Sequence, residues 1–289
     1  MSTGLEEREF ALRSLKLNLA VGPRNGPPLV FFHGVTRRWQ TFLPLLASFL
    51  PRWQVFAVDF PGHGKSDRAG AECPHLVIDY VEYAEEFLRQ YFVGDVYLYG
   101  HSLGSMVAAG AAARLDNIRG IVLEDPPFDV MGERISKTPL LNYFRDLLPF
   151  AGSTESVAAV TRQIAEIRMG ATGSTNTFRL GDIRDGVSLR FTASSLKQLD
   201  PRALQAVVQR NWLEGYDRNA ILAATHCPAL LLQGDVKAGG MLPDEDADDV
   251  IGRLADGTLI RFPGIGHVIH WQKTRDVVNA THGFLETIR

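Results

Sequence analysis

Ser102 stands in a sequence context that suits nucleophilic catalysis. The stretch G-H-S-L-G at 100–104 fits the pattern G-x-S-x-G, with strand formers before it and an alanine-rich helical stretch after it. In this pattern the serine occupies a sharp strand-to-helix turn, and the flanking glycines let the strand and helix pack closely. Because a hydroxyl is a poor nucleophile at neutral pH, the chain must also supply a base, an acid that orients it, and N–H donors for the oxyanion.

The N–H donors of an oxyanion hole are expected at two places. One is Leu103, the residue after the nucleophile, and the other lies in H-G-V-T at 33–36, after an apolar run. In that loop Val35 is the candidate donor. His33 and Gly34 are expected to border the bound substrate.

The base must be a histidine, and His267 is the favoured candidate among eight. It lies in F-P-G-I-G-H-V-I-H at 262–270, after the last predicted strand, at the end where sites gather in open α/β sheets. His270 is the alternative. The other histidines belong to other motifs, lie beside prolines or fall inside the last predicted helix: His33, His63, His75, His101, His226 and His282.

Strands and helices that would position these residues alternate along the chain. Short apolar runs without polar alternation indicate strands that are buried on both faces of a parallel sheet, within a doubly wound α/β fold. Residues 10–20 alternate apolar and polar, which predicts a half-exposed antiparallel edge strand or hairpin. The predicted strands are 27–32, 54–60, 96–99, 120–125, 228–235 and 258–262, and the helices between them are 79–92, 105–114, 244–255 and 274–288.

The alternation stops from about 128 to 225, where helical patterns dominate. An insertion of this size between two strands predicts a separate layer over the sheet. We therefore predict a core formed by 1–126 and 227–289, with a helical cap at 127–226 between strands six and seven. Its predicted helices are 138–148, 155–169, 193–198 and 201–214, with a loop at 169–176.

The motifs H-G-V-T (33–36), D-F-P-G-H-G-K-S (59–66), G-H-S-L-G (100–104) and G-I-G-H (264–267) follow one another in this order. In them the chain resembles proteins of the α/β-hydrolase fold over essentially its whole length. The resemblance implies a mostly parallel eight-stranded sheet flanked by helices, an inserted cap, and a nucleophile–acid–histidine triad that needs neither metal nor organic cofactor.

The acid of the triad has two candidates. Many members of the family carry it after strand seven, in a stretch like G-x-x-D, but here Lys237 holds that position and Asp235 comes two residues early. Haloalkane dehalogenases and zearalenone-type lactonases carry it at the end of strand six, where G-I-V-L-E-D-P-P at 120–127 supplies Asp125. We favour Asp125 and keep Asp235 as the alternative. The neighbouring Glu124 is not a candidate, because it would point to the opposite face of the strand.

Acyl transfer is the chemistry that these parts would perform, with Ser102 as nucleophile, His267 as base and Asp125 as the orienting acid. A serine at this position argues against dehalogenase or epoxide-hydrolase chemistry, which needs a carboxylate nucleophile in this family. The expected activity is that of a carboxylic-ester hydrolase or lactonase acting on an uncharged, fairly hydrophobic small molecule. Candidate pocket residues are Phe128, Tyr143, Phe144 and Trp212.

Three other functions are compatible with the same motifs. Hydrolysis of a carbon–carbon bond in a ring-fission product uses the same triad, and Arg37 and Arg38 could then bind an acidic substrate. Cofactor-free haloperoxidase or perhydrolase activity is the second. A small-ligand receptor that keeps the triad is the third, and slow single turnover with retained product would mark it.

Composition bounds the partners and the compartment. The chain has 289 residues, a formal net charge of −3 and no basic cluster that would indicate nucleic-acid binding. No apolar run approaches the length of about 20 residues that a membrane span needs. Cys73 and Cys227 lack metal-type spacing, which predicts free thiols in a reducing compartment, and a cytoplasmic protein is expected. The expected partner is a small-molecule ester or lactone, and the protein is expected to be a monomer or a homodimer.

Overall fold

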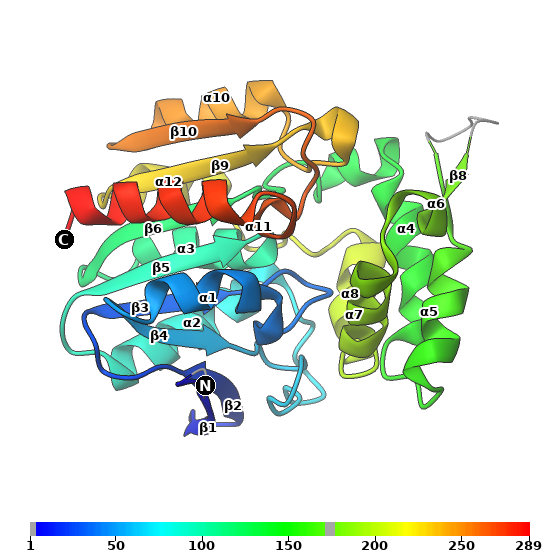
Figure 1. Ribbon diagram of the computed structural model, residues 1–289, viewed down its shortest axis with the longest axis horizontal. Helices are drawn as coiled ribbons and strands as arrows, with labels where there is room; N and C mark the ends of the chain where they lie inside the picture. Colours follow the sequence, from blue (N-terminus) through cyan, green and yellow to red (C-terminus); the bar gives the residue numbers. More distant parts are fainter. Residues whose placement is uncertain (1–3, 171–176) are drawn as a thin grey trace.

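The computed structural model describes residues 4–170 and 177–289, and its centre is an eight-stranded mixed sheet. The strand order is β1-β2-β4-β3-β5-β6-β9-β10, in which β1 and β2 run antiparallel to their neighbours and the other six strands are parallel (Figure 1). The strands are β1 (Glu6–Ala11), β2 (Lys16–Val21), β3 (Pro28–Phe32), β4 (Gln54–Val58), β5 (Val96–His101), β6 (Ile118–Glu124), β9 (Ala229–Gly234) and β10 (Gly257–Phe262). This architecture confirms the predicted fold class.

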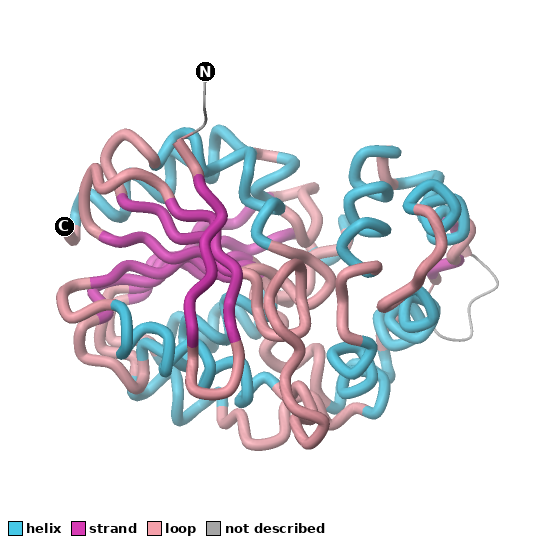
Figure 2. The backbone as a smooth tube through the Cα atoms, turned by 90° about the horizontal axis from the view of Figure 1, so that it is seen from below, coloured by secondary structure: helices cyan, strands magenta, loops and turns pink. Residues whose placement is uncertain are grey.

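Helices cover both faces of the sheet, which explains why the parallel strands are apolar throughout. Figure 2 shows helices on both sides of the sheet. Because successive strand residues point to opposite faces, the sheet separates two hydrophobic clusters. One cluster contains the buried side chains of α2 (Val77–Tyr91), α3 (Leu103–Ala112) and α10 (Asp244–Arg253). The other contains those of α1 (Leu43–Phe49) and α12 (Thr274–Thr287). The short helices η1 (Trp39–Phe42) and α11 (Ile269–Gln272) add buried side chains to this second cluster, while η4 (Val236–Ala238) follows β9 and buries none of its residues.

A helical insert lies between β6 and β9, at the end of the sheet where the parallel strands finish (Figure 1). Its elements are η2 (Glu133–Lys137), α4 (Leu140–Leu147), η3 (Leu148–Phe150), α5 (Val157–Ala165), β7 (Arg168–Met169), β8 (Phe178–Arg179), α6 (Leu180–Ile183), α7 (Gly186–Leu196), α8 (Pro201–Gln209) and α9 (Arg218–Ala224). The last of them, α9, contacts α3 and α10 of the core. The insert is thus present, while its limits at 127 and 226 stay a prediction.

Several element limits differ from the sequence-based expectations because of local capping. The α7 helix begins at Gly186 rather than at 193, since the Asp185 side chain accepts a hydrogen bond from Ser188 N at 2.8 Å and caps it. The α2 helix begins two residues early because Asp79 reaches back to Leu76 N at 2.7 Å. Of the loop predicted at 169–176, residues 171–176 lie outside the described part of the chain.

Two observations concern the cysteines and the possibility of a membrane-spanning helix. Cys73 and Cys227 are free thiols, each half-buried. In the ranges 4–170 and 177–289, no helix combines the length and the apolar character needed to cross a bilayer.

Candidate active site

Ser102 occupies a strained turn between β5 and α3. Its φ of 57° and ψ of −118° fall in a region that costs a non-glycine residue about 1–3 kcal/mol. Ser102 N donates to Glu124 O at 2.9 Å, which ties the turn to β6, and the Ser105 hydroxyl donates to Gly100 O at 2.7 Å, which ties it to β5. The surroundings thus over-determine the strained conformation, as expected of a nucleophile held at the start of a helix.

The two glycines of the motif are required by close packing. A Cβ at Gly104 would lie 1.9 Å from Phe32 O, and a Cβ at Gly100 would lie 2.2 Å from Gly104 O. No side chain fits at such distances. The glycines therefore allow α3 to approach β3 and β5 closely enough to hold the turn.

Asp125 and His267 form a hydrogen-bonded pair beside this turn. Asp125 follows β6 with a φ of 46°, is fully buried, and places Oδ2 at 2.6 Å from His267 Nδ1. Its carboxylate also accepts hydrogen bonds from Gly234 N at 3.0 Å and Met241 N at 2.7 Å. Because Nδ1–H is used by the carboxylate, the lone pair of His267 Nε2 is available to accept a proton.

Asp235, the alternative acid, does not contact His267. Its carboxylate accepts hydrogen bonds from Lys237 N at 2.8 Å and Gly264 N at 2.9 Å, and its own N–H donates to Ile265 O at 2.7 Å. The hydrogen bonds from Gly264 and Lys237 lower the pKa of this exposed carboxyl. Asp235 thus holds the loop that precedes His267 in place.

The loop at 33–36 abuts the serine turn, as an oxyanion hole requires. A Cβ at Gly34 would lie 3.1 Å from Ser102 Cβ, so glycine permits the close approach. Within the described residues, neither Val35 N nor Leu103 N donates a hydrogen bond to a protein acceptor. Both expected donors are therefore available to a ligand.

His33 anchors this loop and is not exposed to a substrate. Its ring is fully buried, with Nδ1 at 2.9 Å from Gly34 O, while Nε2 accepts a hydrogen bond from Phe60 N at 3.1 Å. Burial, together with the neighbouring His63, holds the pKa of His33 well below its usual range, so the ring stays neutral. No contact in the described structure supports the expectation that His33 borders the substrate, which stays a prediction.

His101 connects the serine turn to the histidine loop. Its Nε2 donates to His267 O at 3.1 Å, and the two ring centroids are 4.7 Å apart. Burial, then the charges of His267, His270 and Arg37, hold the pKa of His101 well below its usual range. In the part of the chain that is described, Ser102 Oγ makes no hydrogen bond to His267, and such bonds often tighten only when substrate is present.

A second histidine–carboxylate pair lies on the opposite face of β6. His270 Nδ1 is 2.8 Å from both carboxylate oxygens of Glu124, and Tyr99 OH donates to the same carboxylate at 2.6 Å. Both members of the pair are fully buried. His270, the alternative base, is therefore committed to Glu124, which points away from Asp125 as the strand alternation predicted.

One group of described residues has the composition of a metal site. Ligand atoms of His101, Glu124 and His270 lie within 4.8 Å of one another. The carboxylate of Glu124, however, already accepts hydrogen bonds from Tyr99 and from the His270 ring and N–H. A metal would have to displace these donors, so the residues do not fit a metal centre as they stand.

The four aromatic residues expected in the pocket are all buried. The Phe128 ring stacks on Tyr216, with centroids 6.5 Å apart. Tyr143 contacts Phe144 and accepts a hydrogen bond from Arg184 Nη1 at 3.2 Å. Trp212 Nε1 is buried without a partner in the described structure. These contacts leave their role in binding a prediction.

Sequence reasoning missed Arg184 and Trp271, which lie with Tyr143 around Arg37. The guanidinium of Arg37 is 5.3 Å from the Trp271 ring, and the charge of Arg184 acts on it. These residues belong to segments far apart in the chain, so no local motif could have brought them together.

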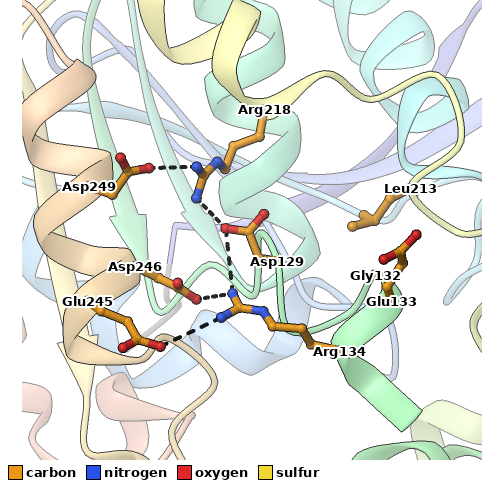
Figure 3. A pocket seen from close by; sticks show the side chains of 9 residues that line it. All are labelled: Asp129, Gly132, Glu133, Arg134, Leu213, Arg218, Glu245, Asp246 and Asp249. Carbon is orange, nitrogen blue, oxygen red and sulfur yellow. Dashed lines mark hydrogen bonds and ion pairs between the residues drawn. The ribbon is translucent and has the colours of Figure 1, made fainter. Parts of the chain in front are cut away.

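A surface pocket lies where the insert meets α10 (Figure 3). Two arginines bridge its carboxylates: Arg218 pairs with Asp129 and Asp249, and Arg134 pairs with Asp129 and Asp246. None of the predicted catalytic residues lines it. Its lining consists of Asp129, Gly132, Glu133, Arg134, Leu213, Arg218, Glu245, Asp246 and Asp249.

Short stretches of the chain are similar to curated hydrolases. A stretch of 87 residues is 34% identical to an (E)-2-((N-methylformamido)methylene)succinate hydrolase from Acinetobacter baylyi, and covers 30% of this chain and 32% of that protein. A stretch of 102 residues is 36% identical to a 2-(acetamidomethylene)succinate hydrolase from Mesorhizobium japonicum, and covers 35% and 36%. The chain thus matches only about a third of the length of each.

Longer matches are more distant in sequence. A pimeloyl-[acyl-carrier protein] methyl ester esterase from Xanthomonas campestris is 24% identical over 271 residues, which cover 91% of this chain and 97% of that protein. The structure of an E-2-(acetamidomethylene)succinate hydrolase superposes with a TM-score of 0.74 at 22% identity, and covers 98% of this chain and 99% of the other. An enol-lactonase from Burkholderia xenovorans gives a TM-score of 0.71 at 15% identity, with 96% and 100% covered. These superpositions establish the fold.

A family profile described as "Alpha/beta hydrolase family" matches residues 29–281, which include the serine turn, the helical insert and the histidine loop. The chain therefore belongs to the alpha/beta hydrolase family.

Proposed function

We propose that this hydrolase cleaves a carboxylic ester or lactone of a small molecule through an acyl-enzyme on Ser102. The observation that carries the proposal is the 2.6 Å contact between His267 Nδ1 and Asp125 Oδ2 beside a serine held at a strained turn. A buried acid that fixes the tautomer of a histidine next to a nucleophile is the arrangement that acyl transfer needs.

The proposed reaction has two steps. Ser102 Oγ attacks the carbonyl carbon while His267 Nε2 takes the hydroxyl proton, and the N–H groups of Val35 and Leu103 bind the oxyanion. Each such donor typically contributes about 3 kcal/mol to the barrier reduction. When the tetrahedral intermediate collapses, His267 gives the proton to the leaving alkoxide, and water then hydrolyses the acyl-enzyme with the same histidine as base.

The relatives support this reaction class. The curated proteins that the chain matches include methyl ester esterases and hydrolases of methylenesuccinates, and the structural neighbours include a carboxylesterase and lactonases. All of these names describe hydrolysis of small molecules or small acyl groups. An ester or lactone substrate is accordingly our proposal for this chain.

Acid release in a pH-stat tests the proposal. The panel contains aryl esters, alkyl esters, small lactones and macrolactones, and the Ser102→Ala variant is the control. We expect turnover of at least one class by the wild type and loss of that turnover in the variant. Equal turnover by both proteins, or none by folded wild-type protein on the whole panel, would contradict it.

Hydrolysis of a carbon–carbon bond in an acidic ring-fission product is the second candidate. The observation that favours it is Arg37, which lies beside the loop at 33–36, is buried and has no ion pair among the described residues, so that it suits an acidic substrate. A ring-fission dienone absorbs in the visible range, so its bleaching by the enzyme would distinguish this reaction from ester hydrolysis.

A further inference from the structure

Arg37 is a buried cation without a counter-ion in the described structure. The residue is only 5% exposed. Among the described residues its guanidinium forms no ion pair, and Nη1 is buried without a hydrogen-bond partner. Buried charges in proteins are normally paired, because an uncompensated charge in a medium of low dielectric constant is strongly unfavourable. This arginine therefore has unused binding capacity.

Aromatic rings form the walls around this guanidinium. Its central carbon is 5.5 Å from the Phe191 ring of α7 and 5.3 Å from the Trp271 ring of α11. The two rings contact each other edge to face, with centroids 5.0 Å apart. The insert and the core thus together shield the charge from water, which strengthens its attraction for an anion.

Two further cations lie nearby, Arg184 and Arg38, and the central carbon of the Arg38 guanidinium is 5.4 Å from the same Phe191 ring. Burial and the charge of Arg184 lower the pKa of Arg37 to about 10, and among the described residues Tyr143, not a carboxylate, acts against this shift. Arg37 nevertheless remains protonated at neutral pH. Arg184 Nη1 donates to Tyr143 OH at 3.2 Å and has no ion pair among the described residues. The site therefore carries an excess of positive charge.

The location of Arg37 relates this charge to the proposed catalytic residues. Arg37 N donates to Gly34 O at 2.9 Å, so its backbone closes the turn that contains the proposed oxyanion donor Val35. The same Gly34 lies against Ser102, and the charge of Arg37 acts on His101, the residue before the nucleophile. An anion on Arg37 would lie alongside the serine turn.

We propose that Arg37 binds a carboxylate of the substrate, so that the molecule cleaved at Ser102 is an ester or lactone that carries a free carboxylate elsewhere. A planar guanidinium suits a carboxylate because two of its N–H groups can bind the two oxygens. This class differs from the uncharged substrate expected from the sequence. The inference rests on the proposed function, since it places the anion relative to the serine that would attack the ester.

Matched pairs of methyl esters test the charge preference. The monomethyl esters of succinate, glutarate and adipate are compared with the corresponding dimethyl esters by acid release. For the wild type we expect kcat/KM to be about tenfold or more higher for the best monoanion than for its neutral partner, as a charged hydrogen bond implies. A wild type that prefers the neutral diester would overturn the proposal.

Variants of Arg37 test the assignment to this residue. In Arg37→Met, the ratio of kcat/KM for the monoanion to kcat/KM for the dimethyl ester should fall about 10- to 100-fold. Arg37→Lys keeps the charge and should retain part of the preference. Arg190→Met removes an exposed arginine from α7 and should leave the preference unchanged. An equal loss for both esters in Arg37→Met would overturn the proposal.

A binding measurement separates this inference from the proposed function. Free glutarate, titrated into Ser102→Ala by calorimetry, should bind, and the double variant with Arg37→Met should not bind it. If no ester is turned over but glutarate binding depends on Arg37, the anion site stands and the proposed function fails. If esters are turned over but glutarate binds equally well without Arg37, the anion site fails and the proposed function stands.

Discussion

Two consecutive carboxylates at the end of β6 each bind the Nδ1 atom of a histidine. The two pairs differ in the partners of the other ring nitrogen, Nε2. Glu124 and Asp125 project to opposite faces, toward His270 and His267. His270 Nε2 is used by Thr41, with contacts of 3.1 Å to its carbonyl and 3.2 Å to its hydroxyl. His267 Nε2 has no partner in the described structure, and its side chain is 15% exposed.

This difference teaches that a histidine–carboxylate pair is not by itself a catalytic feature. Both pairs have short contacts, of 2.6 and 2.8 Å, and both carboxylates are fully buried. Only the Asp125 pair leaves a nitrogen lone pair near the serine turn, while every polar atom of the Glu124–His270 pair is bonded within the protein. We therefore expect the first pair to control turnover and the second to control stability.

Replacing Asp125, the proposed acid of the triad, should give the largest effect, a loss of kcat. Asp125→Asn should lower kcat by about 10⁴-fold, because an amide in place of the carboxylate favours the wrong histidine tautomer. Asp235→Asn should change kcat less than about tenfold, since Asp235 holds only the loop before His267. Steady-state kinetics on the best ester, with both variants checked for folding by circular dichroism, measure the two effects. A large loss in Asp235→Asn alone would make Asp235 the catalytic acid.

Replacing the other carboxylate should act on stability instead. Glu124→Gln leaves Tyr99 OH and the His270 ring competing for an amide that has one acceptor, in a fully buried site. We expect the free energy of unfolding to fall by about 3 kcal/mol, as when one partner of a buried pair is lost. Urea unfolding measures the change. A kcat that falls as far as in Asp125→Asn, without loss of stability, would reverse the roles of the two pairs.

The same carboxylate should make the stability depend on pH. Burial opposes ionisation of Glu124, but the charge of His270 and hydrogen bonds from His270 and Tyr99 outweigh it and lower its pKa. Because the pKa is lower in the folded state, this stabilisation is complete above the ordinary value near 4.5 and is lost as the pH falls through the folded value. The stability difference between wild type and Glu124→Gln should therefore shrink on acidification. Urea titrations between about pH 7 and pH 3 test this, and a constant difference would refute it.

Much of the fold and of the candidate site could be predicted because the relevant signals are local. Continuous apolar runs marked the parallel strands to within a few residues, and the glycine spacing around Ser102 marked the turn. The partners that fix these residues could not be predicted. The backbone N–H of Met241 binds Asp125, and α7 folds over Arg37, only because segments more than a hundred residues apart meet in the folded chain. Such contacts have no periodicity that a sequence displays.

The ion pairs of the surface pocket in Figure 3 are partly exposed, in contrast to the fully buried Glu124–His270 pair. Arg218 bridges Asp129 and Asp249, with its side chain 15% exposed and theirs 35% and 38% exposed. Solvent screens such pairs, so Arg218→Met should cost at most about 1 kcal/mol, against about 3 kcal/mol for Glu124→Gln. The cost should shrink further at high salt, because pairs near the surface are screened while fully buried ones are not. Urea unfolding at low and high salt measures both variants, and a salt-independent loss of 3 kcal/mol or so for Arg218→Met would mean that burial does not separate these carboxylates from Glu124.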